Sequence, residues 1–537
     1  MTLCDGCLPV KRTRLIAPPP PENPVDVIAR IVGQEPGGLP VSVVESIWKI
    51  VECFKVNMTD TRRVRDHIPD AVITEIAEYV ERFQPRSKLA WATAHDCLLD
   101  SLGCAFEALA YPECMKLVGP AVPGTRVPNG ARVPGTSLQL DPVDATFSTG
   151  ALVRWVDYSD AFFGATVMHP SDAFCAILSV ADWLSRSRLA RGKRPLVMRD
   201  VLRAAIQAYE MIGWMGLENN FTRTGRDNAL LVKVAVAAVV TRMLGGGRQE
   251  IVSALSNAWI DGHALATFRR APNTGSRKSW SAPDAASRGV WLALMAMKGE
   301  MGYPTALSAK TWGFYDVVFA GKPFKFSRPL GSYIVENVLF KISYPAALHA
   351  QTAVEAAIRL HPLARDRLDE IAKVELWTHE TCVLMIDKSG PLHNFADRDH
   401  CLQYMAALGL IFGTLCARDY EDEFAADPRI DALRAKMVVH EDRRYSREYL
   451  DPDKRSNANA IRVHFHDGTA TPRVEVEYPL GHRARRREGA PLLLEKFTRN
   501  VTRAFAEKQR MAVLEVCCDR VRLSGMPVNE FMDLLAA

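Results

Sequence analysis

The stretch 154–172 combines side chains that could perform acid–base chemistry. It places the carboxylates of Asp157 and Asp160 shortly before the imidazole of His169, which Pro170 follows directly. Acid–base catalysis needs groups of different proton affinity held close together, and this stretch could supply them. The alternative is a loop histidine beside two capping aspartates with no catalytic role, and spacing alone does not decide between the two.

The same stretch predicts how His169 is positioned. Proline is favoured at the first position of a helix, and serine and aspartate can accept hydrogen bonds from the unpaired amides there. The order His169-Pro170-Ser171-Asp172 therefore predicts a helix that starts at Pro170 and is capped by Ser171 and Asp172. A histidine at such a helix entrance can point into a cleft.

A second cluster, at residues 275–279, could bind an anion. The hydroxyls of Ser276 and Ser279 flank the cations Arg277 and Lys278, and such groups suit a carboxylate or a phosphate. The spacing is not that of a nucleotide-binding P-loop. A solvated basic loop is the alternative.

Lys341 and His349 lie where the sequence pattern changes. Lys341 stands among apolar residues in the segment 340–345, where burial would lower the pKa of its amine. Alternatively, its stem covers apolar surface and its amine reaches water. A lone histidine such as His349 is more often structural than catalytic. No metalloprotease, hydrolase or dinucleotide-binding motif occurs in a supporting context.

Composition limits the class of protein. The 537 residues are 48% hydrophobic and 24% charged, as in ordinary globular proteins, and this length predicts two or more domains. No apolar run approaches the roughly 20 residues needed to cross a membrane, so we expect no membrane partner. The net charge of +5 suits small anionic substrates and does not call for nucleic acid.

The cysteines predict neither a metal nor an iron–sulfur cluster. Only Cys4 and Cys7 have C-x-x-C spacing, and no second pair follows at the distance of a zinc site. We expect reduced cysteines in an intracellular protein. Residues 1–24 lack the apolar core of a signal peptide, so we expect an unstructured tail, with a mitochondrial presequence as the alternative. The expected location is the cytoplasm or the mitochondrial matrix.

Residues 25–336 are expected to form a helical domain. Apolar residues recur every three or four positions, which predicts helices over 25–31, 41–54, 71–83, 87–104, 173–186, 199–216, 228–244, 248–266 and 285–299. Prolines and glycines dominate 111–150, which predicts a long ordered loop or a functional arm there rather than a helix.

Residues 337–486 are expected to form a smaller α+β domain. Apolar and polar residues alternate as in strands over 372–376, 461–465 and 473–478, between helical stretches at 351–359 and 400–410. The helical pattern returns in residues 487–537, over 492–507 and 526–535, which are expected to rejoin the first domain. The predicted fold class is therefore mainly α.

Several longer motifs lie between about residues 85 and 490. They are Asp100-Ser-Leu-Gly103, Tyr111-Pro-Glu-Cys114, Val133-Pro-Gly-Thr136, His169-Pro-Ser-Asp172, Ala271-Pro-Asn-Thr-Gly-Ser-Arg-Lys-Ser-Trp280, Trp312-Gly-Phe-Tyr-Asp316, Glu336-Asn-Val-Leu-Phe-Lys-Ile-Ser343, Asp397-Arg-Asp-His400 and Glu477-Tyr-Pro-Leu-Gly-His482. In this order they resemble the MmgE/PrpD family, which includes dehydratases of 2-methylcitrate and a decarboxylase of cis-aconitate. They resemble the dehydratase branch more closely.

This resemblance implies an architecture and a set of functional positions. The large helical domain would be built from both chain ends, the α+β domain would form a lid, and the cleft between them would work in a homodimer without metal, iron–sulfur cluster or other cofactor. By motif match, the functional positions are Asp160, His169, Lys278, Lys341 and His349. The substrate would be a small tricarboxylate.

Two departures from the family pattern bear on activity. The family has polar and bulky residues where this chain has an apolar run over 161–168, including Phe162 and Met168. The family also has a histidine where this chain has Asn228, and an amide cannot shuttle a proton. Either that histidine is dispensable for this substrate, or activity is altered or lost.

These observations lead us to predict a cofactor-independent hydro-lyase that removes water from a 2-alkylcitrate. Arg277, Lys278 and Lys341 would hold the carboxylates and stabilise an enolate-like transition state. The base would be Asp160 or His169. The further substrate-binding residues would be Ser276, Asn228, His349, Phe162 and Met168.

The substrate stays open between several alternatives. The apolar exchange over 161–176 suggests a pocket for an alkyl chain longer than methyl, as in secondary metabolism, where alkylcitrates become alkylaconitates or maleic anhydrides. The alternatives are a 2-methylcitrate dehydratase of propionate metabolism, then a cis-aconitate decarboxylase, then an inactive homologue that only binds.

Overall fold

The computed structural model describes residues 40, 42, 43, 45, 46, 68–270 and 272–537. The chain divides into two compact units, residues 1–67 and 68–537, and the features below belong to the second. The expected tail over 1–24 and the expected helix over 25–31 lie outside the described residues, as does nearly all of the expected helix over 41–54.

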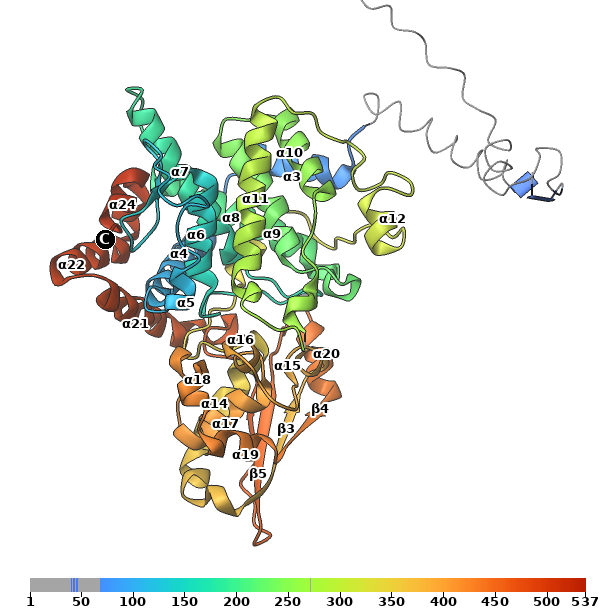
Figure 1. Ribbon diagram of the computed structural model, residues 1–537, viewed down its shortest axis with the longest axis vertical. Helices are drawn as coiled ribbons and strands as arrows, with labels where there is room; N and C mark the ends of the chain where they lie inside the picture. The colour runs from blue at the N-terminus through green and yellow to red at the C-terminus, as the bar shows by residue number, and fades with distance from the viewer. Residues whose placement is uncertain (1–39, 41, 44, 47–67, 271) are drawn as a thin grey trace, which may run out of the picture. The chain divides into compact units, whose positions relative to one another are not determined.

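A group of helices forms the first part of this unit (Figure 1). The long helices are α3 (Ala71–Arg82), α4 (Lys88–Ala108), α6 (Pro142–Arg154), α7 (Phe174–Leu189), α8 (Met198–Glu218), α9 (Ala229–Met243), α10 (Arg248–Ile260) and α11 (Arg277–Met297). The short elements are α5 (Pro112–Met115), β1 (Ala131–Arg132), β2 (Gln139–Leu140), η3 (Pro170–Ala173), η4 (Thr222–Thr224), η5 (Ala266–Arg269), α12 (Phe314–Phe319) and α13 (Tyr333–Glu336). Helix α9 is buried all along 229–241, because α8, α10 and α11 pack around it.

The segment 111–150 contains more helix than the sequence predicted. It contains α5, the paired strands β1 and β2, and most of α6. Helix α6 begins at Pro142, and the side chain of Asp141 accepts hydrogen bonds from the amides of Val143 and Asp144. The prediction that this segment has no helix was wrong for residues 142–150, because the prolines and glycines before residue 136 masked this capping signal.

Helix α11 also begins earlier than predicted. It starts at Arg277 rather than near 285 and continues through Pro283. Gly150 of α6 lies against Pro283 so closely that a Cβ atom there would be 2.9 Å from the proline ring. Close packing between α6 and α11 therefore supports a helix that the proline alone argued against.

The second part of the unit has a four-stranded sheet in the order β4-β3-β5-β6. The strands are β3 (Ile371–Thr378), β4 (Met437–Glu441), β5 (Asn459–Phe465) and β6 (Val474–Val476). β3 is parallel to β4 and antiparallel to β5, and β5 is antiparallel to β6. The sequence did not predict β4, because this edge strand is only partly buried and its residues do not alternate.

Helices α14 and α17 pack against each other beside this sheet. The helical elements of this part are η6 (Leu348–Ala350), α14 (Gln351–Ala364), η7 (Arg365–Glu370), α15 (Glu380–Ile386), α16 (Phe395–Arg398), α17 (Leu402–Phe412), η8 (Ala417–Tyr420), α18 (Asp422–Ala425), α19 (Pro428–Arg434) and α20 (Arg443–Leu450). Their buried apolar residues form a hydrophobic core of their own between Ala346 and Val476. We call this part the lid.

The C-terminal helices return to the helical part. They are η9 (Arg483–Arg485), α21 (Arg486–Ala504), α22 (Glu507–Cys518), α23 (Arg520–Gly525) and α24 (Val528–Leu534). α21 packs along α4, and α24 packs on α7 (Figure 1). The predicted fold class, mainly α with a smaller α+β part, is confirmed.

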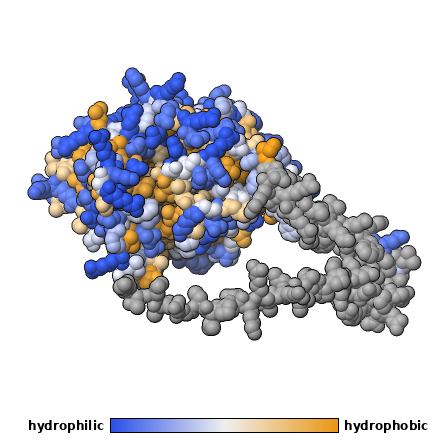
Figure 2. Space-filling view, turned by 90° about the horizontal axis from the view of Figure 1, so that it is seen from above, coloured by the Kyte–Doolittle hydropathy of each residue, from blue (hydrophilic) through white to orange (hydrophobic). Residues whose placement is uncertain are grey.

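The surface shows a mixture of residue types. Figure 2 shows hydrophilic residues over much of one face, with hydrophobic residues in smaller groups between them, as on ordinary protein surfaces. Within the part of the chain that the structure describes, no helix is long and apolar enough to cross a membrane.

Candidate active site

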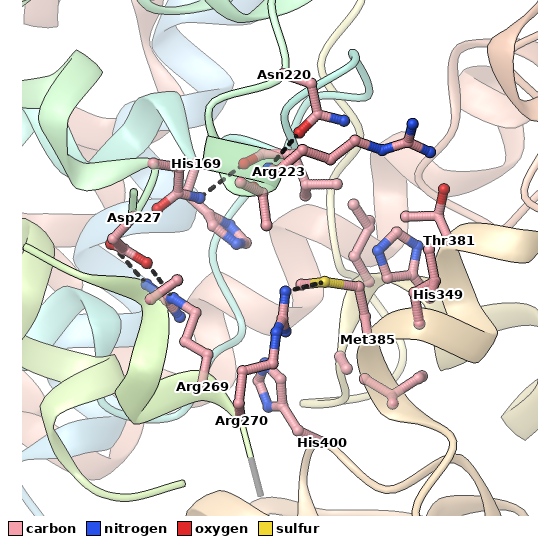
Figure 3. Close-up of a pocket in the computed structure, with 18 of the residues that line it drawn as sticks. His169, Asn220, Arg223, Asp227, Arg269, Arg270, His349, Thr381, Met385 and His400 are labelled. Carbon is pink, nitrogen blue, oxygen red and sulfur yellow. Dashed lines mark hydrogen bonds and ion pairs between the residues drawn. The ribbon is translucent and has the colours of Figure 1, made fainter. Parts of the chain in front are cut away.

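A cavity of about 270 Å³ lies where the helical part meets the lid (Figure 3). The helical part contributes Asp157, Ala165, Val167, His169, Asn220, Thr222, Arg223, Arg226, Asp227, Asn228, Ala266, Arg269 and Arg270. Residues from 347 onward contribute Ala347, Leu348, His349, Glu380, Thr381, Leu384, Met385, Ile386 and His400. Histidines, arginines and carboxylates thus line one small space together with apolar residues.

His169 is held with one ring nitrogen free for chemistry. Its Nδ1 lies 2.9 Å from the backbone oxygen of Asp160. A carbonyl only accepts, so Nδ1 carries the proton and Nε2 keeps a lone pair. Burial, together with Arg154 and Lys341, holds the pKa of His169 well below its ordinary range. His169 is therefore a neutral imidazole that can accept a proton.

Asp160 supports His169 and is not among the residues that line the cavity. Its carboxylate accepts hydrogen bonds from the Tyr209 hydroxyl at 2.7 Å and from the Ser171 amide at 3.2 Å. The predicted capping by Ser171 and Asp172 was therefore wrong: neither side chain caps the short helix η3. The carboxylate of Asp160, nine residues before His169 in the chain, binds an amide of this short helix instead.

Asp157 is the carboxylate of the opening stretch that reaches the cavity. It adopts a left-handed backbone conformation with φ of 45°, which non-glycine residues adopt only where the surroundings hold them. Its carboxylate pairs with Lys341 at 3.0 Å and with Arg154 at 2.9 Å. Burial alone would raise the pKa of Asp157, but Lys341 and Arg154 together hold it well below the ordinary range. Asp157 is thus ionised, and it anchors Lys341.

Lys341 is completely buried, as one of the two sequence alternatives required. Its amine also donates to the backbone oxygen of Asp157 at 2.7 Å. The amine of Lys496, from α21, donates to the backbone oxygens of Tyr158 and Lys341 and to Asp100. The C-terminal helices therefore hold the two segments that carry Asp157 and Lys341.

A second chain of charged groups ends at His400. The amine of Lys278 lies 2.5 Å from Asp399, and the other oxygen of Asp399 lies 2.7 Å from Nδ1 of His400. His400 lines the cavity, whereas Lys278 and Asp399 lie behind it. Sequence reasoning did not name His400 as a site residue, although the motif 397–400 contained it.

The arginines around the cavity differ in whether they have a partner. Arg269 pairs with Asp227 through two contacts of 2.5 and 3.3 Å. Arg270 has no carboxylate partner among the described residues. Its Nη2 contacts the sulfur of Met385 at 3.1 Å, and its buried Nη1 has no hydrogen-bond partner there. Nε of Arg226 is likewise buried and unpartnered within the described part of the chain.

Asn228 and His349 both line the cavity. The amide of Asn228 donates to the backbone oxygen of Val167 at 2.7 Å. His349 is buried, and its Nδ1 has no hydrogen-bond partner among the described residues. Burial and the neighbouring His379 and His400 hold the pKa of His349 well below its ordinary range.

Besides Asp160, Lys278 and Lys341, four more predicted site residues do not line this cavity. Arg277 pairs with Asp284 and faces a separate cavity next to α9. Ser276 precedes the first residue of α11 and makes no capping hydrogen bond. Phe162 and Met168 belong to the hydrophobic core of the helical part. The sequence could not show which side chain of two neighbours faces the cavity. Met168 is buried in the core, whereas the adjacent His169 lines the cavity.

The arrangement suits proton transfer next to a small anion. The neutral imidazole of His169 can accept a proton. Arg226 and Arg270, which have no carboxylate partner in the described part of the chain, offer guanidinium donors to carboxylates. Among the described residues, no group of three or more histidine, cysteine, aspartate or glutamate side chains is placed to hold a metal ion.

Comparisons with known proteins match two domains in this chain. The MmgE/PrpD N-terminal domain matches residues 74–327, and the MmgE/PrpD C-terminal domain matches residues 344–520. The chain belongs to the MmgE/PrpD family. The family resemblance seen in the sequence is thereby confirmed.

Several MmgE/PrpD relatives are similar over most of their length. The 2-methylcitrate dehydratase of Cupriavidus necator is 56% identical over 89% of this chain and 99% of the relative. That of Salmonella typhimurium is 57% identical over 87% and 97%. The mitochondrial 2-methylcitrate dehydratase of Yarrowia lipolytica is 51% identical over 89% and 92%. The prediction of a hydro-lyase of the dehydratase type is confirmed by these similarities.

Proposed function

We propose that this chain removes water from 2-methylcitrate. The observation that carries the proposal is a small cavity with a neutral histidine and two arginines that lack a carboxylate partner among the described residues, in a chain more than half identical to proteins named 2-methylcitrate dehydratase. A volume of about 270 Å³ lies just below the range of about 300–1,000 Å³ typical of pockets for larger ligands. It suits a small tricarboxylate.

Binding would rely on Arg226 and Arg270, which have no carboxylate partner among the described residues. Each would hold one carboxylate of the substrate, whereas Arg223, at the exposed edge of the cavity, lies 3.9 Å from Glu380. Planar guanidinium groups match carboxylates in two-point hydrogen bonding. Arg269 is already occupied by Asp227, and so it would shape the cavity rather than bind.

The elimination would begin with proton removal by Nε2 of His169. The proton to be removed lies on the carbon next to a carboxylate, and its loss places negative charge on that carboxylate. The guanidinium groups of Arg226 and Arg270 line the cavity, so positive charge is fixed near the developing enolate before the reaction starts. Asp160 would act only by positioning His169, which departs from the role that the sequence alone allowed it.

A 2-alkylcitrate with a longer chain is a second candidate substrate. Five residues of the cavity lining are apolar: Ala165 and Val167 from the helical part, and Leu384, Met385 and Ile386 from the lid. Apolar groups there would accept further methylene groups, each worth about 0.8 kcal/mol when buried. These five residues, rather than the buried Phe162 and Met168, support the hypothesis of a role in secondary metabolism.

The experiment is product analysis by mass spectrometry with 2-methylcitrate and 2-hexylcitrate supplied separately. We expect a product lighter by one water from 2-methylcitrate. Faster water loss from the hexyl compound would favour the second candidate. Released carbon dioxide would instead indicate a decarboxylase, and binding without turnover would indicate an inactive homologue, as the replacement at Asn228 allows.

We also propose a homodimer, on the family resemblance alone. Light scattering during size-exclusion chromatography would test it: the mass of two chains is expected, and the mass of one chain would contradict it.

Microscopy of the tagged protein would distinguish the cytoplasm from the mitochondrial matrix, the two compartments expected from the sequence.

A further inference from the structure

The proposed elimination needs a proton for the departing hydroxyl group, and His400 is built to carry one. Its Nδ1 lies 2.7 Å from Oδ1 of Asp399. An ionised carboxylate only accepts hydrogen bonds, so Nδ1 is protonated and Nε2 is the nitrogen left for the cavity. His400 lines that cavity from the lid.

Asp399 distinguishes His400 from His169. The ring of His169 donates to a neutral carbonyl, whereas the ring of His400 donates to a carboxylate. A full negative charge at this distance favours the charged form of an imidazole much more than a carbonyl dipole does. Of the two rings, His400 is therefore the better proton carrier and His169 the better proton acceptor.

Lys278 keeps Asp399 in the form that this role needs. Its amine lies 2.5 Å from Oδ2 of Asp399, and both groups are almost fully buried. Burial alone would raise the pKa of Asp399, but Lys278 and His400 together lower it. Asp399 therefore stays ionised and does not take the proton from His400.

The substrate itself would complete the charge balance. Burial lowers the pKa of His400, and Lys278 adds to this effect, whereas Asp399 opposes it without reversing it. A bound tricarboxylate brings negative charge next to the ring and so favours its protonated form.

We propose that His400 is the catalytic acid, with Asp399 and Lys278 as its positioning pair. The step rests on the proposed function and balances as follows. His169 takes the proton from carbon, the C–H electron pair forms the C=C bond, and the C–O bond breaks. The oxygen keeps that bond's electron pair, receives the proton from Nε2 of His400 and leaves as water. The proton on His169 then returns to His400 through solvent.

The two groups approach from different walls of the cavity. Figure 3 shows His169 beside η4 and Asp227 in the helical part, and His400 on the lid. This arrangement allows proton removal on one side of the substrate and proton delivery on another.

The test compares 2-methylcitrate with its analogue that carries fluorine in place of the departing hydroxyl. Fluoride leaves without taking a proton, so an acid matters only for the hydroxyl compound. For His400→Gln we expect kcat/KM to fall about 100-fold or more on 2-methylcitrate and by less than about fivefold on the fluoro analogue. His169→Gln removes the base and is expected to lose activity on both compounds alike.

His464→Gln is the matched control, because His464 pairs with Glu375 on the sheet and does not line the cavity. It is expected to retain wild-type rates. Asp399→Asn, checked for folding by circular dichroism, provides a second variant with the same expected preference for the fluoro analogue. Equal losses on both compounds in His400→Gln and Asp399→Asn would overturn the assignment of His400. A wild-type protein inactive on both compounds would overturn the proposed function itself, and the assignment with it.

Discussion

Arg270 and Arg269 are adjacent arginines for which the structure predicts opposite effects of the same substitution. Arg269 is paired with the buried Asp227, whereas Arg270 has no carboxylate partner among the described residues and its Nη1 is buried without a hydrogen bond. Arg270→Met therefore removes a cation that is available to bind a carboxylate of the substrate. A hydrogen bond to a charged group contributes about 1.5–3 kcal/mol, so KM for 2-methylcitrate should rise roughly 10- to 150-fold.

The same pair of variants separates binding from stability. Arg270→Met breaks no ion pair, and its free energy of unfolding should change by less than about 1 kcal/mol. Arg269→Met leaves the carboxylate of Asp227 buried without its cation, which should cost about 3–5 kcal/mol. Steady-state kinetics give KM, and urea unfolding gives stability. An Arg270→Met protein with unchanged KM, or one as unstable as Arg269→Met, would refute the reasoning.

Three further outcomes are expected. Lys341→Met should lower the free energy of unfolding by about 3–5 kcal/mol because it leaves Asp157 buried with one cation fewer. The double variant that also carries Asp157→Asn should recover part of this loss in urea unfolding. No recovery would contradict the pairing. Burial lowers the pKa of His379 from its ordinary 6.5 to about 4. Between these two pH values the unfolded chain binds more protons than the folded chain. The stability contributed by His379 should therefore be full above about pH 6.5 and fall by up to about 3 kcal/mol as pH drops toward 4. Urea unfolding at several pH values should show a smaller loss of stability in His379→Gln, and an identical loss would contradict this account. Val167→Trp should fill the space beside the apolar lining residue Ala165 and reduce kcat/KM for 2-hexylcitrate by about tenfold or more relative to 2-methylcitrate. An equal reduction for both substrates would place the alkyl group elsewhere.

The sequence was most informative where a long apolar stretch contains no proline or glycine. The central helix α9 has apolar residues on every side, and its predicted range of 228–244 differs from Ala229–Met243 by one residue at each end. The segment 111–150 was not predictable in the same way. Its helix α6 depends on one capping aspartate and on packing against α11, and neither effect appears in a periodicity.

The candidate site was only partly predictable for a related reason. The stretch 154–172 was recognised, but spacing cannot tell which of Asp157 and Asp160 reaches the cavity. That choice depends on groups far away in the chain: Lys341 pairs with Asp157, and Tyr209 donates to Asp160. His400 was overlooked because its role depends on the ion pair between Asp399 and Lys278. These two residues are 121 positions apart in the chain, so the sequence does not show that they are in contact.

The central claim is that this cavity dehydrates 2-methylcitrate with His169 as the base. The most direct test incubates wild-type protein and His169→Gln with 2-methylcitrate and follows the product by mass spectrometry. We predict a product lighter by one water from the wild type, and a rate lower by about 100-fold or more in the folded variant. A wild type that leaves 2-methylcitrate unchanged, or a variant as fast as the wild type, would contradict the account.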